Sequence, residues 1–326
     1  MANPHVYVTR FIPEAGLDRI RAIAETEVWE GEEPPPYKIL LEKIDGLDGL
    51  VCLLTDRIDA ELMDAAGGAL KVISQMAVGF DNIDVAAATE RGIPIGNTPG
   101  VLTDTTADFA FALLMAAARR IVEGEHYVKA GKWLTWGPTL LMGSDIHDAT
   151  LGLIGFGRIG RGMAKRARGF SMRVLYFDPL VEGAAASELG AQPSVLDNLL
   201  TESDFVSMHV PLTEQTTHMI SDREFGLMKS STILINTARG PVVDPKALYR
   251  ALIDGEIAYA ALDVTDPEPI STDDPLLKLD NCLIVPHIAS SSFATRSRMA
   301  IMAAENLEAG LRGERLPNCV NPELYK

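Results

Sequence analysis

The sequence predicts an α/β protein of two domains, each built around a parallel sheet. Short runs of apolar and β-branched residues alternate with amphipathic stretches, which is the pattern of β–α–β units. The chain has 326 residues, enough for about two domains of ordinary size. Long helical patterns at residues 103–130 and 295–310 separate two series of these units, so we expect them to cross between the domains.

The first series lies in the N-terminal hundred residues. Its strands are expected at residues 6–9, 49–54 and 71–75, and its helices at residues 13–24 and 58–66. The second series is longer. Its strands are expected at residues 151–155, 173–177, 205–209, 232–236, 258–264 and 282–285, with helices at residues 158–169, 195–200 and 245–254. Residues 34–36 and 137–144 are expected to be surface loops.

The C-terminal segment predicts how the domains are assembled. The last few dozen residues follow the second long helical pattern, and we expect them to return and pack on the first domain. One domain would then consist of residues 1–99 and 289–326, and the other of residues 100–288 inserted between them.

The composition disfavours several classes of partner. The 45 acidic residues exceed the 29 basic ones and give a formal net charge of −16. Such a surface repels phosphate backbones and anionic lipids, so we expect neither nucleic-acid nor membrane binding. No uncharged apolar run reaches the roughly 18 residues of a membrane span. An anionic substrate would need positive charge supplied by the site itself.

The cysteines indicate a reducing compartment. Cys52, Cys282 and Cys319 are odd in number, widely separated and without a CxxC pair, which argues against both a disulfide framework and a zinc site. The N-terminus lacks the basic and apolar regions of a signal peptide. We therefore expect a cytoplasmic protein without a bound metal.

A glycine-rich turn predicts dinucleotide binding. Residues 155–160 read GFGRIG, directly after an expected strand and at the start of an expected helix. Gly155 would permit the tight turn, Gly157 would let the backbone approach the pyrophosphate, and Gly160 would let helix and strand pack closely. Phosphates would bind the free N–H groups at the helix N-terminus. This context predicts a Rossmann nucleotide domain with a doubly wound parallel sheet.

An acidic residue predicts the choice of cofactor. Asp178 follows the next expected strand, about 20 positions after the turn. A carboxylate there accepts the ribose hydroxyls and repels a 2′-phosphate, and Pro179-Leu180 offers no basic residue to bind that phosphate. The sequence therefore favours NAD over NADP.

Three residues predict the catalytic chemistry. Arg239, Glu268 and His287 each follow an expected apolar strand. Ligands of open α/β sheets bind beyond the carboxyl ends of the strands, so we expect these side chains to share one crevice. Histidine can donate and accept a proton near neutrality, and the planar guanidinium of arginine can bind a carboxylate with two hydrogen bonds.

The sequence resembles the D-isomer-specific 2-hydroxyacid dehydrogenases over nearly its whole length. The resemblance rests on the segments AVGFDNID at residues 77–84, NTPGVLT at 97–103, GFGRIG at 155–160 and HVPLT at 209–213, together with the three loops above. It is closest to the glyoxylate/hydroxypyruvate reductases. It implies a flavodoxin-like substrate domain from both chain ends, an inserted NAD-binding domain and a homodimer.

The resemblance implies a role for each catalytic residue. His287 would donate a proton to the substrate carbonyl as hydride arrives at carbon, and accept it back in oxidation. Glu268 would hold the imidazole and stabilise its charged form. Arg239 would bind the substrate carboxylate and the neighbouring carbonyl. The reaction would interconvert glyoxylate or hydroxypyruvate with glycolate or D-glycerate.

The resemblance also implies contacts with the cofactor. Thr106 would pack beside the nicotinamide ring, Asp263 would accept from its carboxamide, and the backbone of His209 would lie near the adenosine. The other expected cofactor contacts are Arg158, Ile159, Pro211, Thr237, Ala238, His287 and Ser290.

The implied substrate contacts come from both domains. Backbone N–H groups of Val78 and Gly79 would complete the carboxylate site formed by Arg239, and Leu54 would contact the substrate. Trp136 would either anchor its loop or reach the substrate pocket of a partner subunit.

Other functions remain open at this point. A short form of phosphoglycerate dehydrogenase, a D-lactate dehydrogenase and a nicotinamide-sensing corepressor-like scaffold share the expected fold. Phosphite dehydrogenases carry a lysine where Val78 stands, and D-lactate dehydrogenases usually carry aromatic residues where this chain has Ala289, Ser290 and Ser291. A short-chain dehydrogenase is disfavoured because no Tyr-x-x-x-Lys pair is present.

Overall fold

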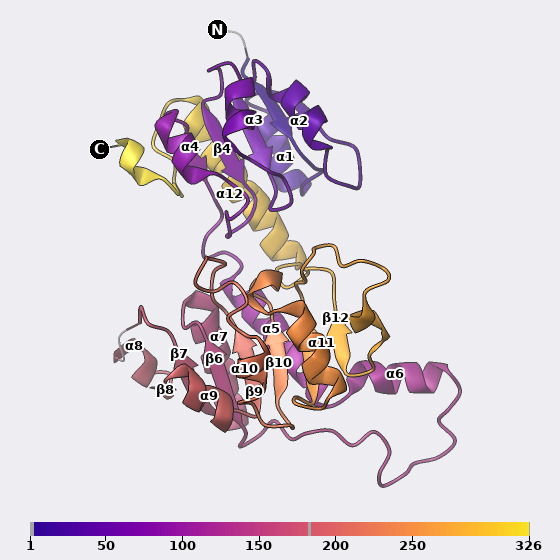
Figure 1. Ribbon diagram of the computed structural model, residues 1–326. Coiled ribbons are helices and arrows are strands. Elements are labelled where there is room, and N and C mark those ends of the chain that lie inside the picture. The colour runs from indigo at the N-terminus through magenta and orange to yellow at the C-terminus, as the bar shows by residue number, and fades with distance from the viewer. Residues whose placement is uncertain (1–2, 182–183, 326) are drawn as a thin grey trace. The chain divides into compact units, whose positions relative to one another are not determined.

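The computed structural model describes residues 3–181 and 184–325 and divides the chain into two compact units. Unit 1 comprises Met1–Leu102 and Ser291–Lys326, and unit 2 comprises Thr103–Ser290. In Figure 1, unit 1 therefore carries the indigo and yellow ends of the colour scale, and unit 2 carries the magenta and orange middle. The sequence analysis placed these divisions at residues 99/100 and 288/289.

Unit 1 is a five-stranded parallel sheet with helices around it. The strand order is β2-β1-β3-β4-β5, the order of flavodoxin-like folds. Its strands are β1 (His5–Val8), β2 (Glu25–Val28), β3 (Gly49–Cys52), β4 (Val72–Gln75) and β5 (Ile95–Gly96). Its helices are α1 (Glu14–Arg21), α2 (Tyr37–Ile44), α3 (Ala60–Ala65), α4 (Val85–Glu90), α12 (Phe293–Leu311) and the short 3₁₀ helix η4 (Pro322–Tyr325).

The C-terminal helix α12 completes the core of unit 1. Met299, Ala303 and Leu307 of α12 are buried together with apolar residues of β1, β3 and β4. The small residues let the backbones approach closely, because a Cβ at Gly16 of α1 would lie 2.5 Å from the backbone of Ala300. Both ends of the chain are therefore needed for one core.

Unit 2 is a seven-stranded parallel sheet in the order β12-β11-β10-β9-β6-β7-β8. Its strands are β6 (Thr150–Ile154), β7 (Arg173–Phe177), β8 (Ala191–Pro193), β9 (Phe205–Met208), β10 (Ile233–Asn236), β11 (Tyr259–Leu262) and β12 (Cys282–Ile284). Its helices are α5 (Thr103–Ala118), α6 (Ile121–Lys129), α7 (Arg158–Ala167), α8 (Ala184–Ser187), α9 (Leu196–Glu202), α10 (Asp222–Phe225) and α11 (Pro245–Ile253), with short 3₁₀ helices η1 (Arg168–Phe170), η2 (Gly240–Val242) and η3 (Pro275–Lys278).

The sheet of unit 2 is doubly wound. From β6 the chain moves through β7 to β8 on one side, and then from β9 to β12 on the other. Apolar cores cover both faces of the sheet, one lined by α5 and α7 and the other by α9 and α11. The predicted fold class, two parallel α/β sheets with a Rossmann arrangement in the second, is confirmed. The order also places a topological switch point between β6 and β9, where ligands of such sheets bind.

The sequence predicts one continuous helical element at residues 103–130. The structure instead has two helices there, α5 and α6. Arg120 adopts a left-handed conformation with φ of 50° between α5 and α6. The chain later returns to the end of α5, where the Ser144 N–H donates to the carbonyl of Ala118 at 2.8 Å. Among the described residues of α6 none is buried, and Figure 1 shows α6 and the loop after it extending from the body of unit 2.

Two further features bear on function. Within residues 3–181 and 184–325, no helix combines the length and the apolar character needed to cross a membrane. The same residues contain no group of three or more histidine, cysteine, aspartate or glutamate side chains arranged to hold a metal ion.

Candidate active site

The glycine turn joins β6 to α7 at the switch point. Gly155 has a φ of +92°, and a Cβ there would lie 2.6 Å from the backbone of His209. A Cβ at Gly160 would lie 2.3 Å from the Gly155 carbonyl oxygen, whereas one at Gly157 would meet nothing within 4 Å. Gly157 is the N-cap of α7 and no side chain caps this end, so the N–H groups of its first turn have no partner within the helix and could bind an anion.

Asp178 is held against this turn. It follows β7, which pairs with β6, and its carboxylate accepts hydrogen bonds from the backbone N–H groups of Phe156 at 2.8 Å and Leu180 at 2.9 Å. These bonds fix the carboxylate beside the glycine turn. Each oxygen keeps a further lone pair, so the carboxylate could still accept from a ribose hydroxyl.

His209 and Pro211 follow β9 on the other side of the switch point. The His209 ring nitrogen Nε2 lies 2.9 Å from the Ser207 hydroxyl. Burial lowers the pKa of His209 to about 3, so the ring is neutral near pH 7. Its Nδ1 is buried and lacks a hydrogen-bond partner within the described chain. Pro211 is exposed, and its carbonyl accepts from Thr216.

The loop after β10 carries Arg239. The buried side chain of Asn236 shapes this loop, accepting from the Ala238 N–H at 3.0 Å and donating to the Arg239 carbonyl at 2.9 Å. The Arg239 guanidinium donates to the Ala238 carbonyl at 2.8 Å. Thr237 is buried, and its hydroxyl has no hydrogen-bond partner in the part of the chain that the structure describes.

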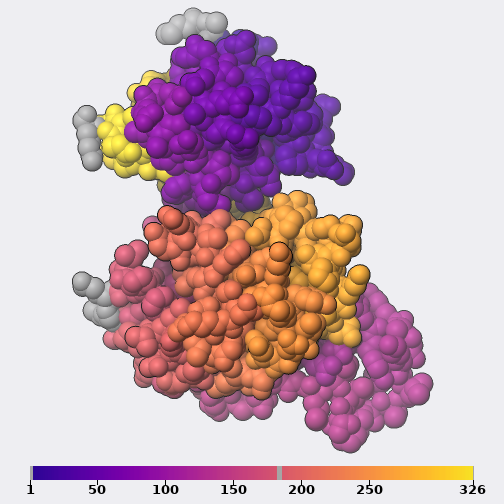
Figure 2. Space-filling view, viewed as in Figure 1, coloured from indigo at the N-terminus to yellow at the C-terminus, as the bar shows by residue number. Residues whose placement is uncertain are grey.

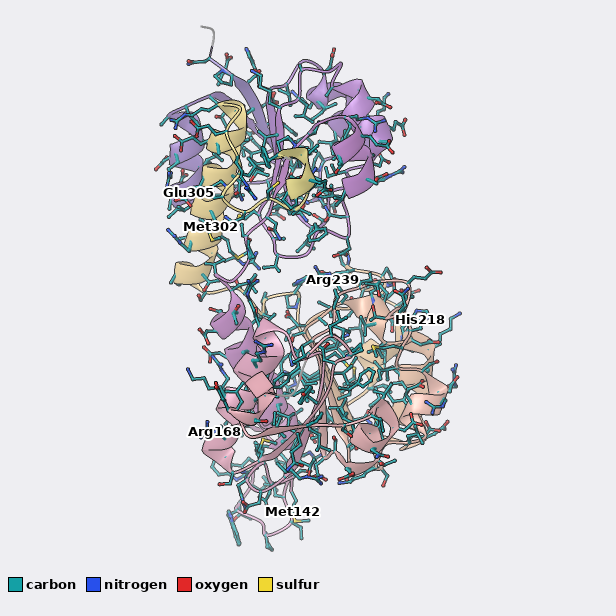
Figure 3. All side chains as sticks on the ribbon, turned by 90° about the vertical axis from the view of Figure 1, so that its left-hand side faces the viewer. Met142, Arg168, His218, Arg239, Met302 and Glu305 are labelled. Atoms are coloured by element: carbon teal, nitrogen blue, oxygen red, sulfur yellow. The ribbon has the colours of Figure 1, made fainter. Side chains whose placement is uncertain are left out.

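The loops after β10 and β11 are packed closely together. A Cβ at Gly240 would lie 1.8 Å from the carbonyl oxygen of Thr265, so only glycine fits beside Arg239. The second loop continues to Glu268 and is braced by a hydrogen bond from the Thr265 hydroxyl to the Pro267 carbonyl at 2.8 Å. In Figure 3, Arg239 and His218 lie at one end of unit 2 and Met142 at the other.

His287 and Glu268 form a close pair. The His287 Nδ1 lies 2.5 Å from the Glu268 Oε1, and both side chains are partly exposed. His287 adopts a left-handed backbone with φ of 52°, and its N–H donates to the Asp263 carbonyl at 2.9 Å. With Nδ1 directed at the carboxylate, Nε2 is the nitrogen available to exchange a proton with a ligand.

Asp263 holds the turn that carries His287. Its buried carboxylate accepts from the backbone N–H groups of Ile288 at 2.6 Å and Ala289 at 2.9 Å. Burial raises the pKa of Asp263, and the charge of nearby Glu268 raises it further. The structure thus gives Asp263 a role in fixing the turn that the sequence did not indicate. Ser290, at the end of the same turn, is buried, and so is Thr106 on α5.

The remaining expected substrate residues lie in unit 1 or on the loop after α6. Leu54 follows β3, and Val78 and Gly79 follow β4, and all three are partly buried. Trp136 is 78% exposed in the loop after α6.

Sequence reasoning missed three amide side chains at the carboxyl end of the sheet in unit 1. Gln75 donates to the Gly79 carbonyl at 2.7 Å, and Asn97 donates to the Val78 carbonyl at 2.9 Å. Asn82 pairs with Gln75. The only sequence feature that could have pointed to Gln75 is its position, as a polar residue at the end of a strand that is fully buried.

Comparison with known proteins identifies the family. Residues 111–289 match the D-isomer specific 2-hydroxyacid dehydrogenase, NAD binding domain family. The chain is 56% identical over 325 residues to a glyoxylate reductase of Korarchaeum cryptofilum, covering 99% of this chain and 98% of the relative. The chain belongs to the D-isomer specific 2-hydroxyacid dehydrogenases.

Two solved structures are similar to this dehydrogenase over nearly its full length. A crystal structure of a protein from Thermus thermophilus has a TM-score of 0.92 and 47% identity, covering 97% of this chain and 99% of that one. The NADPH-dependent glyoxylate/hydroxypyruvate reductase of Sinorhizobium meliloti, in complex with NADP and malonate, has a TM-score of 0.87 and 30% identity, covering 98% and 97%.

The family makes the chain an oxidoreductase that acts on CH–OH groups of a small molecule with a nicotinamide cofactor. The residues of unit 2 fit such a cofactor. The open N-terminus of α7 can bind phosphate, the Asp178 carboxylate can accept from a ribose, and the buried hydroxyl of Thr237 lacks a partner within the described residues. Groups that could hold a nicotinamide cofactor therefore lie at the carboxyl ends of β6, β7 and β10.

Proposed function

We propose that this dehydrogenase reduces glyoxylate and hydroxypyruvate to glycolate and D-glycerate with NADH. The observation that carries the proposal is the 2.5 Å pair of His287 and Glu268, which lies on the loops after β12 and β11 beside the Arg239 loop. The names of the relatives support the substrates, since the similar chains are glyoxylate reductases and a glyoxylate/hydroxypyruvate reductase.

The chemistry follows from the two nitrogen atoms of His287. Glu268 accepts a hydrogen bond from Nδ1 and so orients the ring, which leaves Nε2 as the atom that donates a proton to the substrate carbonyl oxygen. The bound nicotinamide supplies the hydride to the carbonyl carbon. In the oxidative direction the neutral Nε2 accepts the hydroxyl proton. A single histidine therefore serves both directions.

Substrate binding rests on the guanidinium of Arg239 and on backbone N–H groups of unit 1. A guanidinium can form two parallel hydrogen bonds with a carboxylate and also reach the adjacent carbonyl. Val78 and Gly79 would supply further donors to the carboxylate, and Leu54 an apolar contact. These groups provide local positive potential within a chain of net charge −16.

We assign the proposed cofactor contacts to residues around the switch point between β6 and β9. Asp263, which already holds two backbone N–H groups, keeps lone pairs for the nicotinamide carboxamide. Thr106 would border the ring and the His209 backbone the adenosine. The other proposed contacts are those of the glycine turn and of the strand ends: Gly155, Gly157, Arg158, Ile159, Gly160, Pro211, Thr237, Ala238, His287 and Ser290.

The first prediction concerns substrate and cofactor together. With NADH, glyoxylate and hydroxypyruvate should be reduced with higher kcat/KM than pyruvate and 2-oxoglutarate, and NADPH should serve less well because the Asp178 carboxylate repels a 2′-phosphate. Steady-state assays of each acid with each cofactor measure this. Binding of NADH without turnover of any 2-oxo acid would favour a nicotinamide-sensing scaffold and contradict the proposal.

A double substitution provides the control for the cofactor. Asp178→Ser with Pro179→Arg removes the carboxylate and adds a donor for a 2′-phosphate. The ratio of kcat/KM for NADH over NADPH should fall by about tenfold or more, the effect of one hydrogen bond to a charged group. An unmodified enzyme that prefers NADPH would show that Asp178 does not set the choice.

We further propose a homodimer formed through α6 and the loop after it, with the protein in the cytoplasm as its three unpaired cysteines favour. Several large apolar side chains of this loop are exposed: Trp133, Leu134, Trp136 and Met142. Figure 2 shows the magenta surface of this segment standing out from the rest of unit 2. A second copy of the chain would cover it, because exposed apolar patches of this kind mark interfaces. Trp136 would then approach the partner subunit's substrate pocket.

The second prediction tests this interface. Leu134 is 92% exposed, so Leu134→Lys should not disturb the fold of one chain but should weaken the dimer. Light scattering over a range of concentrations should show a dimer for the parent and a larger monomer fraction for the variant. Val195→Lys is the matched control, since Val195 is an exposed apolar residue on the α9 side of unit 2. A monomeric parent would contradict the proposal.

A further inference from the structure

Three amide side chains, one buried and two partly buried, form a frame at the carboxyl end of the sheet in unit 1. Gln75 is the last residue of β4 and is fully buried. Its Nε2 donates to the Asn82 Oδ1 at 2.6 Å, and its Oε1 accepts from the Asn82 Nδ2 at 3.2 Å. The two amides thus pair reciprocally. Asn97, which follows β5, is the third member.

The frame holds consecutive peptide planes of the segment after β4. The Ala77 carbonyl accepts from the Thr98 N–H at 2.9 Å, the Val78 carbonyl from the Asn97 side chain at 2.9 Å, and the Gly79 carbonyl from the Gln75 side chain at 2.7 Å. Because a peptide is planar and trans, a fixed carbonyl fixes the direction of the N–H that follows it. The bond from the Thr98 backbone therefore sets the direction of the Val78 N–H, the bond from the Asn97 side chain that of the Gly79 N–H, and the bond from the Gln75 side chain that of the Phe80 N–H.

The same frame reaches the loop after β3. The Asn82 Nδ2 donates to the Leu53 carbonyl at 3.1 Å and to the Asp56 carbonyl at 2.8 Å. The Asp56 carboxylate in turn accepts from the Leu53 N–H at 2.7 Å and from the Thr9 hydroxyl at 2.5 Å. The loop that carries Leu54 is thereby linked to the segment that carries Val78 and Gly79.

We propose that Asn97 is a positioning residue that aims the N–H group of Gly79 at the substrate carboxylate, and that Gln75, paired with Asn82, supports it by holding the Gly79 carbonyl on the other side of the same residue. This inference rests on the proposed function, which gives the Gly79 N–H group to the carboxylate. Preorganised donors lose no orientation entropy when the ligand binds, so the frame acts on substrate affinity. The three side chains bind no substrate themselves.

The test uses Asn97→Leu, which keeps the approximate size of the side chain and removes its hydrogen bond to the Val78 carbonyl. The KM for glyoxylate should rise about tenfold, the effect of one misdirected hydrogen bond to a charged group. The inhibition constant of oxalate, an unreactive carboxylate, should rise by the same factor, while the KM for NADH stays unchanged. Gln75→Met, which removes the hydrogen bond to the Gly79 carbonyl, is a second variant with the same expected pattern, should Asn97→Leu fail to fold.

Asn321→Leu is the matched control. Asn321 is buried in unit 1, as Gln75 is, and makes the same kind of bonds, but to Ile93 and Ile95 at the start of β5. Its loss should lower Tm without changing the KM for glyoxylate. If Gln75→Met and Asn97→Leu likewise lower Tm and leave both KM and oxalate inhibition unchanged, the positioning role is wrong. A parent that turns over no 2-oxo acid would instead overturn the proposed function, and calorimetric titration of oxalate would still test the frame.

Discussion

Replacing His287 by asparagine should lower kcat for glyoxylate reduction by about 10²–10⁴-fold, the usual contribution of a positioned general acid. Asparagine is a better choice than alanine because His287 has a φ of 52°, a region that asparagine tolerates and alanine does not. The turn should then keep its hydrogen bonds to Asp263. Loss of turnover would report loss of the imidazole alone.

Two measurements separate loss of the proton donor from loss of cofactor binding or of ring orientation. Titration of NADH fluorescence should give the same Kd for the variant and the parent, because the glycine turn and Asp178 are untouched. Glu268→Gln should cost less turnover than His287→Asn, since an amide oxygen can still accept from Nδ1 and orient the ring, whereas His287→Asn removes the proton donor. A variant of His287 within tenfold of the parent, with chemistry shown to be rate-limiting by deuterated NADH, would remove His287 from the proton transfer.

Replacing Arg239 by lysine should reduce kcat/KM for glyoxylate by about 10- to 100-fold, mainly through KM. The substitution keeps the positive charge but loses the planar pair of donors, and hydrogen bonds to charged groups are worth factors of this size. The loop itself should persist, because Asn236 holds it through the backbone of Ala238 and Arg239. Steady-state kinetics at saturating NADH measure the change.

Arg168→Lys is the control for this substitution. Arg168 is an exposed arginine of η1 in the same unit, and Figure 3 shows it well away from Arg239. Its replacement should leave kcat/KM unchanged. Equal kinetics for Arg239→Lys and the parent would return Arg239 to the role of a surface residue.

The sequence predicts the sheet of unit 2 more fully than that of unit 1. Most strands of unit 2 are buried on both faces and read as continuous apolar runs, so periodicity finds them within a few residues. The strands β2 and β5 of unit 1 were missed, and so was the three-residue edge strand β8 (Ala191–Pro193) of unit 2. β2 (Glu25–Val28) is an edge strand with two acidic residues, and β5 (Ile95–Gly96) is two residues long. The strand character of β2 and β5 comes from pairing with β1 and β4, which local composition does not reveal.

In the candidate site, too, local sequence does not reveal residues whose role depends on distant partners. His287, Glu268 and Arg239 could be predicted because each is a chemically distinctive residue directly after an apolar strand, and the close pairing of His287 with Glu268 is present in the structure. Gln75 and Asn97 could not, because a neutral amide carries no signal until its partners are known. Likewise, the role of Asp263 in the His287 turn depends on two backbone N–H groups 25 and 26 residues away.

The division of unit 1 between both chain ends sets an order for folding during synthesis. All of unit 2 leaves the ribosome before α12, whose Met299, Ala303 and Leu307 complete the core around β1, β3 and β4. At roughly 5–20 residues per second, the 188 intervening residues delay α12 by roughly 10–40 s. During that interval the strands of unit 1 expose the face that α12 later covers, while unit 2 already contains every residue of its own sheet. We therefore expect nascent unit 1 to depend on chaperones more than unit 2 does.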